Sequence, residues 1–323
     1  MNSSNFSTTT FLLFIVAQFL LRGLYVMGTT FTFVNKCDHP VWPGLLAGAS
    51  SPKLDSTGFE LPQGGTRTFP APTGWSGRFW GRTGCTFDSS GAGSCSTGDC
   101  GSGQVECNGA GAAPPATLAE FTLNGSGGQD FYDVSLVDGY NLPMIVESSG
   151  GSGGCQTTGC LVDLNRRCPT ELQSEGGGAC RSACEAFGSP EYCCSGEYSS
   201  PATCKPSAYS QLFKNACPRA YSYAYDDASS TFTCSGADYT ITFCPSTPSQ
   251  KASMDPSVGV GANPGSNPVH GAVTGSNSGS GSASLMADGS WLANLASGSS
   301  SNLRHPTIAL HFALLFFFIA LLN

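Results

Sequence analysis

At residues 91–107 the chain reads GAGSCSTGDCGSGQVEC, with three cysteines set among glycine and small polar residues. They belong to a set of sixteen cysteines, all of which lie between Cys37 and Cys244. The short gap between Cys95 and Cys100 occurs in zinc sites as well as in disulfide frameworks. The ends of the chain help to decide between these two interpretations.

The N-terminal residues have the features of a secretory signal peptide, which we expect to span residues 1–28. An apolar run from Phe11 to Leu21 is followed by small residues that end at Gly28. No lysine or arginine precedes the run, so the exact cleavage position stays open, and an uncleaved signal anchor is the alternative. Export favours disulfides over zinc, and His39 is the only histidine in residues 29–244.

The C-terminal residues predict a glycosylphosphatidylinositol anchor. The apolar run Ile308–Leu322 is shorter than the roughly 20 residues that a membrane-spanning helix needs. Small residues around Ser297 and a polar spacer precede it, which is the pattern of an attachment signal. We expect attachment at Ser297 and removal of residues 298–323, with a tail-anchored helix as the alternative.

Residues 245–297 differ in composition from the segment before them. They are rich in Ser, Gly, Pro, Asn and Ala and carry few charges, so they cannot bury enough apolar surface to offset their ordering entropy. We expect a flexible stalk that joins the anchor to one folded domain, residues 29–244. The net charge of −8 argues against binding to nucleic acid.

The folded segment contains short apolar runs bounded by Gly, Pro, Asn or Asp, which is typical of a β-sandwich or barrel. The runs are Thr30–Val34, Gly77–Arg82, Leu118–Leu123, Asp130–Val137 and Tyr239–Phe243. Residues 155–217 differ, because nine cysteines crowd a loop-rich stretch. We expect helices there at Ala179–Phe187 and Ser207–Asn215, the second with Ser207 as N-cap. The sequence therefore predicts a mainly β core with a disulfide-rich side lobe.

Several segments match the motifs of one known family. The segment 91–107 resembles the signature of the thaumatin-like proteins (pathogenesis-related group 5). Further segments that are similar to family motifs are Pro114–Phe121, Phe131–Gly139, Asn141–Met144, Glu191–Cys194 and Cys217–Tyr223. The resemblance covers residues 29–244, and the stalk and tail resemble those of a membrane-anchored subset. It implies a flattened β-sandwich, a disulfide-rich lobe with short helices, and a small third lobe.

The resemblance also implies eight disulfides, because all sixteen cysteines have counterparts in the family. Spacing alone does not choose among the pairings, of which sixteen cysteines allow about two million. The implied pairs are Cys37–Cys244, Cys85–Cys95, Cys100–Cys107, Cys155–Cys234, Cys160–Cys217, Cys168–Cys180, Cys184–Cys193 and Cys194–Cys204. The first of these would join the two ends of the domain.

Members of the family have an acidic cleft between the sandwich and the disulfide-rich lobe. The matching positions here are Arg78, Glu120, Asp133, Asp138 and Asp226. Asp227 could serve in place of Asp226. Alternation along the strand puts Asp133 on the same face as Ser135, and the turn at Asp138-Gly139 has to bring Asp138 back to that face.

Three functions fit these residues. Glycoside hydrolysis needs an acid and a second carboxylate, and crowded carboxylates near an arginine acquire separated pKa values. A weak endo-β-1,3-glucanase would use Glu120 as acid and Asp133 as base or nucleophile. We favour instead a defence or cell-wall protein that binds β-1,3-glucan without turnover; a structural or inhibitory protein of the wall is the third alternative.

We expect a monomer that needs no cofactor or metal and is held at the outer face of the plasma membrane. Asn124 begins the sequon Asn124-Gly125-Ser126 in a glycine-rich turn, which predicts N-glycosylation there.

Overall fold

The computed structural model describes residues 28–246. Nearly all of the predicted signal peptide, the stalk and the attachment signal lies outside these residues. Within residues 28–246, no helix is both long and apolar enough to cross a membrane.

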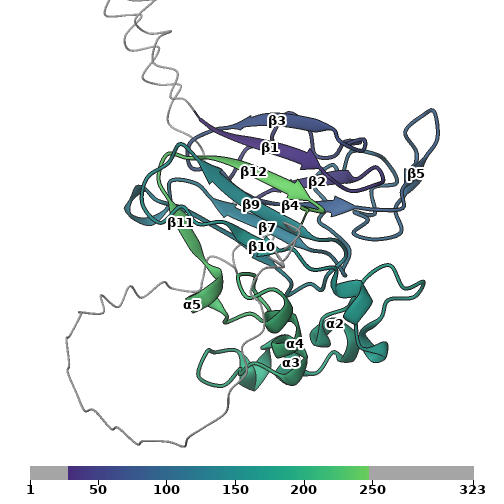
Figure 1. Ribbon diagram of the computed structural model, residues 1–323, viewed down its shortest axis with the longest axis vertical. Coiled ribbons are helices and arrows are strands. Elements are labelled where there is room, and N and C mark those ends of the chain that lie inside the picture. The colour runs from purple at the N-terminus through teal and green to yellow at the C-terminus, as the bar shows by residue number, and fades with distance from the viewer. Residues whose placement is uncertain (1–27, 247–323) are drawn as a thin grey trace, which may run out of the picture.

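Two five-stranded sheets face each other in a sandwich (Figure 1). The first sheet contains, in spatial order, β10 (Thr158–Cys160), β9 (Met144–Ser149), β12 (Asp238–Phe243), β1 (Thr29–Asn35) and β3 (Thr66–Ala71). The second contains β11 (Phe232–Cys234), β8 (Asp130–Ser135), β7 (Leu118–Thr122), β4 (Ser76–Arg82) and β2 (Trp42–Ala47). A separate small hairpin consists of β5 (Thr86–Phe87) and β6 (Gly93–Ser94).

The core of the sandwich is built by alternating side chains from the two inner faces. In β1 the sequence TTFTFVN buries Phe31 and Phe33, while Thr32 between them is only partly buried. The ring of Phe31 lies 4.8 Å from that of Phe79 and 4.7 Å from that of Phe121, both in the opposite sheet. The mainly β sandwich that the sequence predicts is therefore confirmed.

Two strands outside the predicted runs contain proline. β2 carries Pro43 and β3 carries Pro70, and both strands lie at sheet edges, where a missing N–H group does not interrupt the ladder. In β2, a Cβ atom on Gly44 would lie 2.3 Å from the ring of Trp80, so only glycine fits. These residues look like turn signals in the sequence although they belong to strands.

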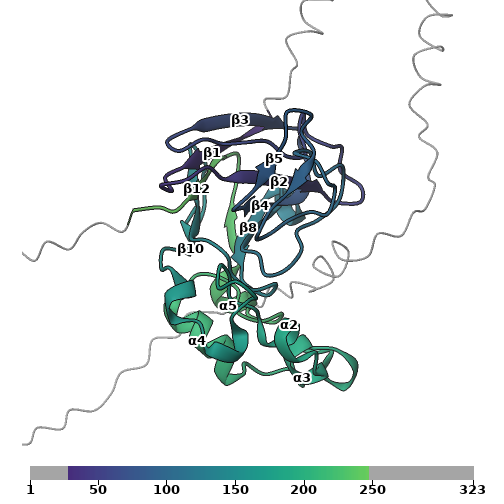
Figure 2. The same cartoon turned by 90° about the vertical axis from the view of Figure 1, so that its right-hand side faces the viewer.

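The disulfide-rich lobe lies below the sandwich in the view of Figure 2. Its helices are short: η2 (Leu164–Arg167), η3 (Thr170–Leu172), α2 (Ala183–Phe187), α3 (Pro190–Cys193), η4 (Gly196–Tyr198) and α4 (Ala208–Ala216). A further turn, α5 (Asp227–Ser230), leads into β11, and η1 (Ser126–Gly128) lies in the loop between β7 and β8. Ser207 caps α4 as predicted, because its hydroxyl accepts a hydrogen bond from the Ser210 N–H at 3.1 Å.

The predicted start of the first lobe helix, at Ala179, is wrong. Cys180 is extended and exchanges two backbone hydrogen bonds with Tyr140, at 2.7 and 2.8 Å. The helix begins only at Ala183, after Ser182, whose hydroxyl caps it. Pairing with a distant segment thus overrides the local helical pattern.

Eight disulfides are present, with the pairing that the family resemblance implies. All cysteines of the chain take part. Cys37 follows β1 and Cys244 follows β12, so their bond joins the ends of two adjacent parallel strands. Five of the eight pairs join cysteines within 155–204 or link that segment to Cys217 and Cys234, and they hold short helices that could not persist alone.

Candidate functional site

Three strands of the second sheet bring one arginine and two carboxyl groups into a row. Arg78 in β4 is directly opposite Glu120 in β7, and Glu120 is directly opposite Asp133 in β8. Side chains in such positions have Cβ atoms about 4.5–5.5 Å apart. We call Arg78, Glu120 and Asp133 the carboxylate row.

The carboxylate row lies on the outer face of the second sheet, on the side of the disulfide-rich lobe. Tyr132 and Val134 belong to the sandwich core, so Asp133 between them points the other way, as alternation predicts. Tyr221, in the segment after α4, covers the end of β8 through two backbone hydrogen bonds of 2.9 Å, one to Leu136 and one to Val134. Sheet and lobe therefore enclose the row between them.

Burial governs the protonation of the two carboxyl groups. Glu120 is 3% exposed and Asp133 is 0% exposed. Burial raises the pKa of Glu120 to about 7, although Arg78 lowers it, and the charge of Asp138 raises it further. Burial also raises the pKa of Asp133 well above its usual value, and the charges of Glu120 and Asp227 add to this effect. No described group donates a hydrogen bond to the Asp133 oxygens, so no hydrogen bond to the charged form offsets this rise in its pKa.

The turn after β8 brings Asp138 back toward the row. Gly139 has φ of 86°, and a Cβ atom there would lie 2.7 Å from Pro115, so this turn requires glycine. Burial raises the pKa of Asp138, while the charge of Arg78 lowers it. Arg78 and Asp138 are half-buried, so both are more accessible to a ligand than Glu120 and Asp133.

The two adjacent aspartates at 226 and 227 have different partners. The Asp226 carboxylate accepts from the Lys214 ammonium at 2.9 Å. The Asp227 carboxylate accepts from the Tyr221 hydroxyl at 2.9 Å, and its charge raises the pKa of Asp133. Of these two aspartates, Asp227 is thus the one that acts on the row electrostatically, while Asp226 is neutralised by Lys214.

Glu185 in α2 is a further acidic neighbour that the sequence interpretation missed. Burial raises its pKa to about 7, Arg181 lowers it, and the charge of Asp138 raises it further. The pattern Ser182-x-x-Glu185 is a capping-box pattern, which explains the residue without any site. We call the carboxylate row together with Asp138, Glu185 and Asp227 the acidic cluster.

The acidic cluster suits a neutral, hydroxyl-rich ligand better than a metal ion. Among residues 28–246, Arg78 forms no ion pair or side-chain hydrogen bond, so its guanidinium donors are free for a ligand. No group of three or more His, Cys, Asp or Glu side chains in that range is arranged to hold a metal ion. Carboxyl groups that accept and an arginine that donates can together bind sugar hydroxyls.

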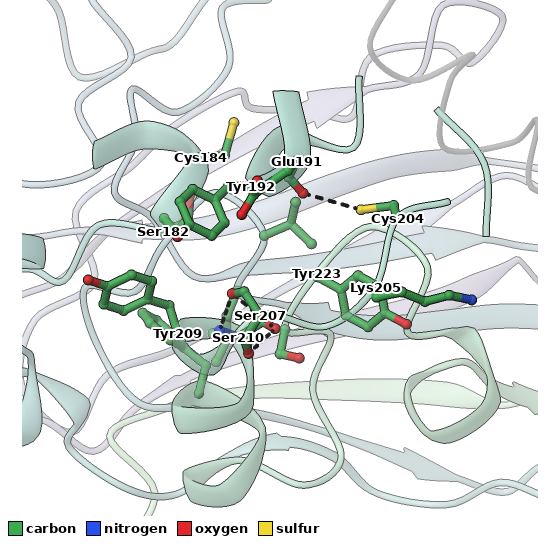
Figure 3. A pocket seen from close by; sticks show the side chains of 15 residues that line it. Ser182, Cys184, Glu191, Tyr192, Cys204, Lys205, Ser207, Tyr209, Ser210 and Tyr223 are labelled. Atoms are coloured by element: carbon green, nitrogen blue, oxygen red, sulfur yellow. Dashed lines mark hydrogen bonds between the residues drawn. The ribbon is translucent and has the colours of Figure 1, made fainter. Parts of the chain in front are cut away.

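A small cavity lies beside this cluster, within the disulfide-rich lobe (Figure 3). It encloses about 30 Å³, and its wall includes Tyr192, Tyr209, Tyr223 and Val137, the residue before Asp138. The members of the acidic cluster do not line it. The cavity is thus a neighbour of the cluster and not the cluster itself.

The fold and the paired cysteines agree with a comparison to known families. The model of the Thaumatin family matches residues 35–245. The chain belongs to the thaumatin family. A relative, Thaumatin-like protein 1 of Arabidopsis thaliana, is 63% identical over 247 residues, which are 73% of this chain and 95% of the relative.

Other thaumatin-family relatives carry more specific names. Pathogenesis-related thaumatin-like protein 3.5 of Cryptomeria japonica is 58% identical, over 72% of this chain and 96% of the relative. A protein of Prunus avium named glucan endo-1,3-beta-glucosidase is 55% identical, over 67% of this chain and 90% of the relative.

Proposed function

We propose that this thaumatin-family chain is an extracellular defence or cell-wall protein whose acidic cluster binds β-1,3-glucan. The observation that supports this most is the row of Arg78, Glu120 and Asp133, in which free donors lie beside buried carboxyl groups. Glucan is neutral and rich in hydroxyl groups, so it can supply both donors and acceptors to such a row. Similarity to a relative named for β-1,3-glucan hydrolysis supports the same polysaccharide.

Binding without turnover agrees better with the geometry than catalysis does. A base or nucleophile must reach the reacting carbon or a water molecule. Asp133 is 0% exposed, whereas Glu120 keeps 3% exposure. The second candidate function is weak endo-β-1,3-glucanase activity, which is supported by a pKa of about 7 for Glu120, suited to a general acid.

One experiment separates these functions. The purified domain is mixed with insoluble β-1,3-glucan; bound protein is measured by sedimentation and released sugars by chromatography. We expect binding without soluble oligosaccharides. Arg78→Ala should weaken binding about tenfold or more, because removing a charged hydrogen-bond donor commonly costs about 1.5–3 kcal/mol. Arg166→Ala, which changes an arginine with an 85% exposed side chain, is the matched control and should bind like wild type.

Glu120→Gln distinguishes the enzyme from the binding module. The amide preserves shape but cannot transfer a proton. If sugars are released by wild type and lost in this variant, the chain is an enzyme. If neither wild type nor variants bind glucan, the proposal is wrong and the structural or inhibitory role at the wall takes its place.

We further propose the attachment of a glycosylphosphatidylinositol anchor at Ser297 and of a glycan at Asn124. Ser297 lies outside the described residues. Asn124 is exposed, in the loop between β7 and β8, where a glycan meets no obstruction from the core. Release of the protein from membranes by phosphatidylinositol-specific phospholipase C tests the anchor, and a protein that stays in the membrane fraction overturns that assignment. A mass shift after removal of N-glycans tests Asn124, and an unchanged mass overturns the glycan.

A further inference from the structure

The disulfide-rich lobe carries a cluster of three aromatic rings, each from a different helix. Phe187 ends α2, Tyr192 lies in α3 and Tyr209 lies in α4. Their ring centroids are 5.3–5.9 Å apart. Phe187 is 45% exposed, and within residues 28–246 only one other large hydrophobic side chain, Leu161, is exposed to a similar extent. We call these three rings the aromatic platform.

The platform is held in place without any ligand. Cys184 in α2 is bonded to Cys193 in α3, so the helices that carry Phe187 and Tyr192 are joined covalently. The hydroxyl of Tyr209 donates to the Glu171 carboxylate at 3.0 Å. A ligand that stacks on rings already fixed in this way loses little free energy to ordering them.

Helix α2 connects the platform to the acidic cluster, because it carries both Phe187 and Glu185. The small cavity of the lobe lies next to this helix, which contributes Ala183 and Cys184 to its wall. Figure 3 shows Tyr192 and Tyr209 on one side of this cavity and Tyr223 on the other. Val137, beside Asp138, and Ser222, which donates to Asp226, also line it. Because the cavity encloses only about 30 Å³, it has room for water but not for a sugar ring. A ligand therefore has to lie across the rings and not inside the cavity.

The groups around the platform indicate the class of ligand. The faces of aromatic rings carry partial negative charge and attract C–H groups. The Glu171 carboxylate accepts from the Tyr209 hydroxyl, and Glu191 lines the cavity, so carboxylates that accept hydrogen bonds lie next to the rings. This combination fits pyranose rings, which have C–H faces and hydroxyl edges, and it repels anionic ligands.

We propose that the aromatic platform is a second subsite for the same glucan chain, which receives sugar rings beyond those bound at the acidic cluster. The inference rests on the proposed glucan binding. The second subsite implies that the protein binds long β-1,3-glucan segments more tightly than short ones, because a short oligosaccharide cannot occupy the cluster and the platform together. Each sugar ring that stacks on the platform then increases the affinity for glucan, while the contacts at the acidic cluster stay the same.

A series of soluble β-1,3-gluco-oligosaccharides of increasing length, titrated by calorimetry, tests this. Wild type should gain affinity with length. Phe187→Ala should lose that gain, with affinity for the longest ligand falling by roughly three- to tenfold. Affinity for the shortest ligand should stay unchanged. Tyr209→Phe keeps the ring and should keep the gain, and Leu161→Ala, the change at the other exposed apolar side chain, is the control.

The outcomes separate the inference from the function on which it rests. If Arg78→Ala weakens binding at every length but Phe187→Ala changes nothing, the cluster binds glucan and the platform does not. That result overturns the inference alone and leaves the rings as a contact for a protein partner. If wild type binds no oligosaccharide of any length, both the proposed function and this inference are wrong. Melting temperatures like that of wild type show that the variants are folded.

Discussion

At the scale of single residues, Glu120 and Asp133 show how a fold changes the chemistry of ordinary carboxyl groups. Both are nearly or completely buried and lie directly opposite each other. Ionising both would place two negative charges side by side with little water to screen them. The pair therefore holds a proton at a pH at which exposed carboxyl groups have lost theirs, and this proton can serve either as a hydrogen-bond donor to a sugar or as a catalytic proton.

These protons predict how stability depends on pH. An acid with a higher pKa in the folded than in the unfolded protein binds more protons when folded, so the free energy of unfolding falls as pH rises between the two values. For Glu120 this fall is expected between pH 4.5, its ordinary pKa, and a pH of about 7, its pKa in the folded protein. Glu106 has a lowered pKa, so the stability that it contributes is already complete above pH 4.5. It therefore does not offset the fall expected from Glu120.

We expect the melting temperature to fall from pH 4.5 to 7.5 and the fall to be smaller in Asp133→Asn. This variant leaves Glu120 as the only titrating acid of the pair, so Glu120 no longer has to lose its proton beside a second carboxyl group, and stability should depend less on pH. Calorimetric melting across the pH range checks this. Glu60→Gln changes an exposed carboxylate and is the control. An Asp133→Asn profile parallel to that of wild type would contradict the assignment of a shared proton.

At the scale of elements, local patterns were sufficient where they faced no competing tertiary contact. Alternating aromatics predicted β1, and Ser207 predicted the start of α4. The edge strand β2 was missed, because its Pro43 and Gly44 look like a turn until the position at the sheet edge and the ring of Trp80 are known. Such elements depend on neighbours that are distant in sequence, and no local pattern contains them.

The packing of α4 yields a prediction for the segment that follows it. Lys214 donates to the Asp226 carboxylate at 2.9 Å, to the Ser230 hydroxyl at 2.8 Å and to the Ala220 carbonyl at 3.0 Å. Lys214→Met keeps helix propensity but leaves Asp226, with an 11% exposed side chain, without its counter-charge. We expect a loss of about 2 kcal/mol in unfolding free energy, less than for a fully buried pair because Lys214 is partly exposed.

Urea denaturation measures this loss. Lys205→Met provides the comparison, because Lys205 is exposed and donates only to the Pro201 carbonyl in the described structure. It should cost less than about 0.5 kcal/mol. Equal effects of the two substitutions would show that the contacts of Lys214 do not stabilise the segment.

At the scale of the whole molecule, the site positions came from family resemblance and their arrangement came from the structure. The sequence could not show that Glu120 lies between Arg78 and Asp133, because strand register is set by the turns and the core as a whole. Nor could it show Glu185 or choose between Asp226 and Asp227, since these residues reach the cluster through the docking of the lobe. Placement between distant segments is what sequence patterns leave open.

The disulfide between Cys37 and Cys244 acts on the whole domain, and its effect can be compared with that of a short loop. It joins residues 207 positions apart, whereas Cys100–Cys107 joins residues 7 apart. In the chain-entropy model, the longer loop restricts the unfolded chain more, by about 3 kcal/mol.

We expect replacement of Cys37 and Cys244 by alanine to lower the unfolding free energy by about 3 kcal/mol more than replacement of Cys100 and Cys107. Denaturant titration of both variants measures the difference. Three of these four cysteines are almost fully buried, so the packing lost is similar and loop length is the main difference. Equal losses would mean that the native contacts of these bonds, and not the constraint on the unfolded chain, account for their contribution.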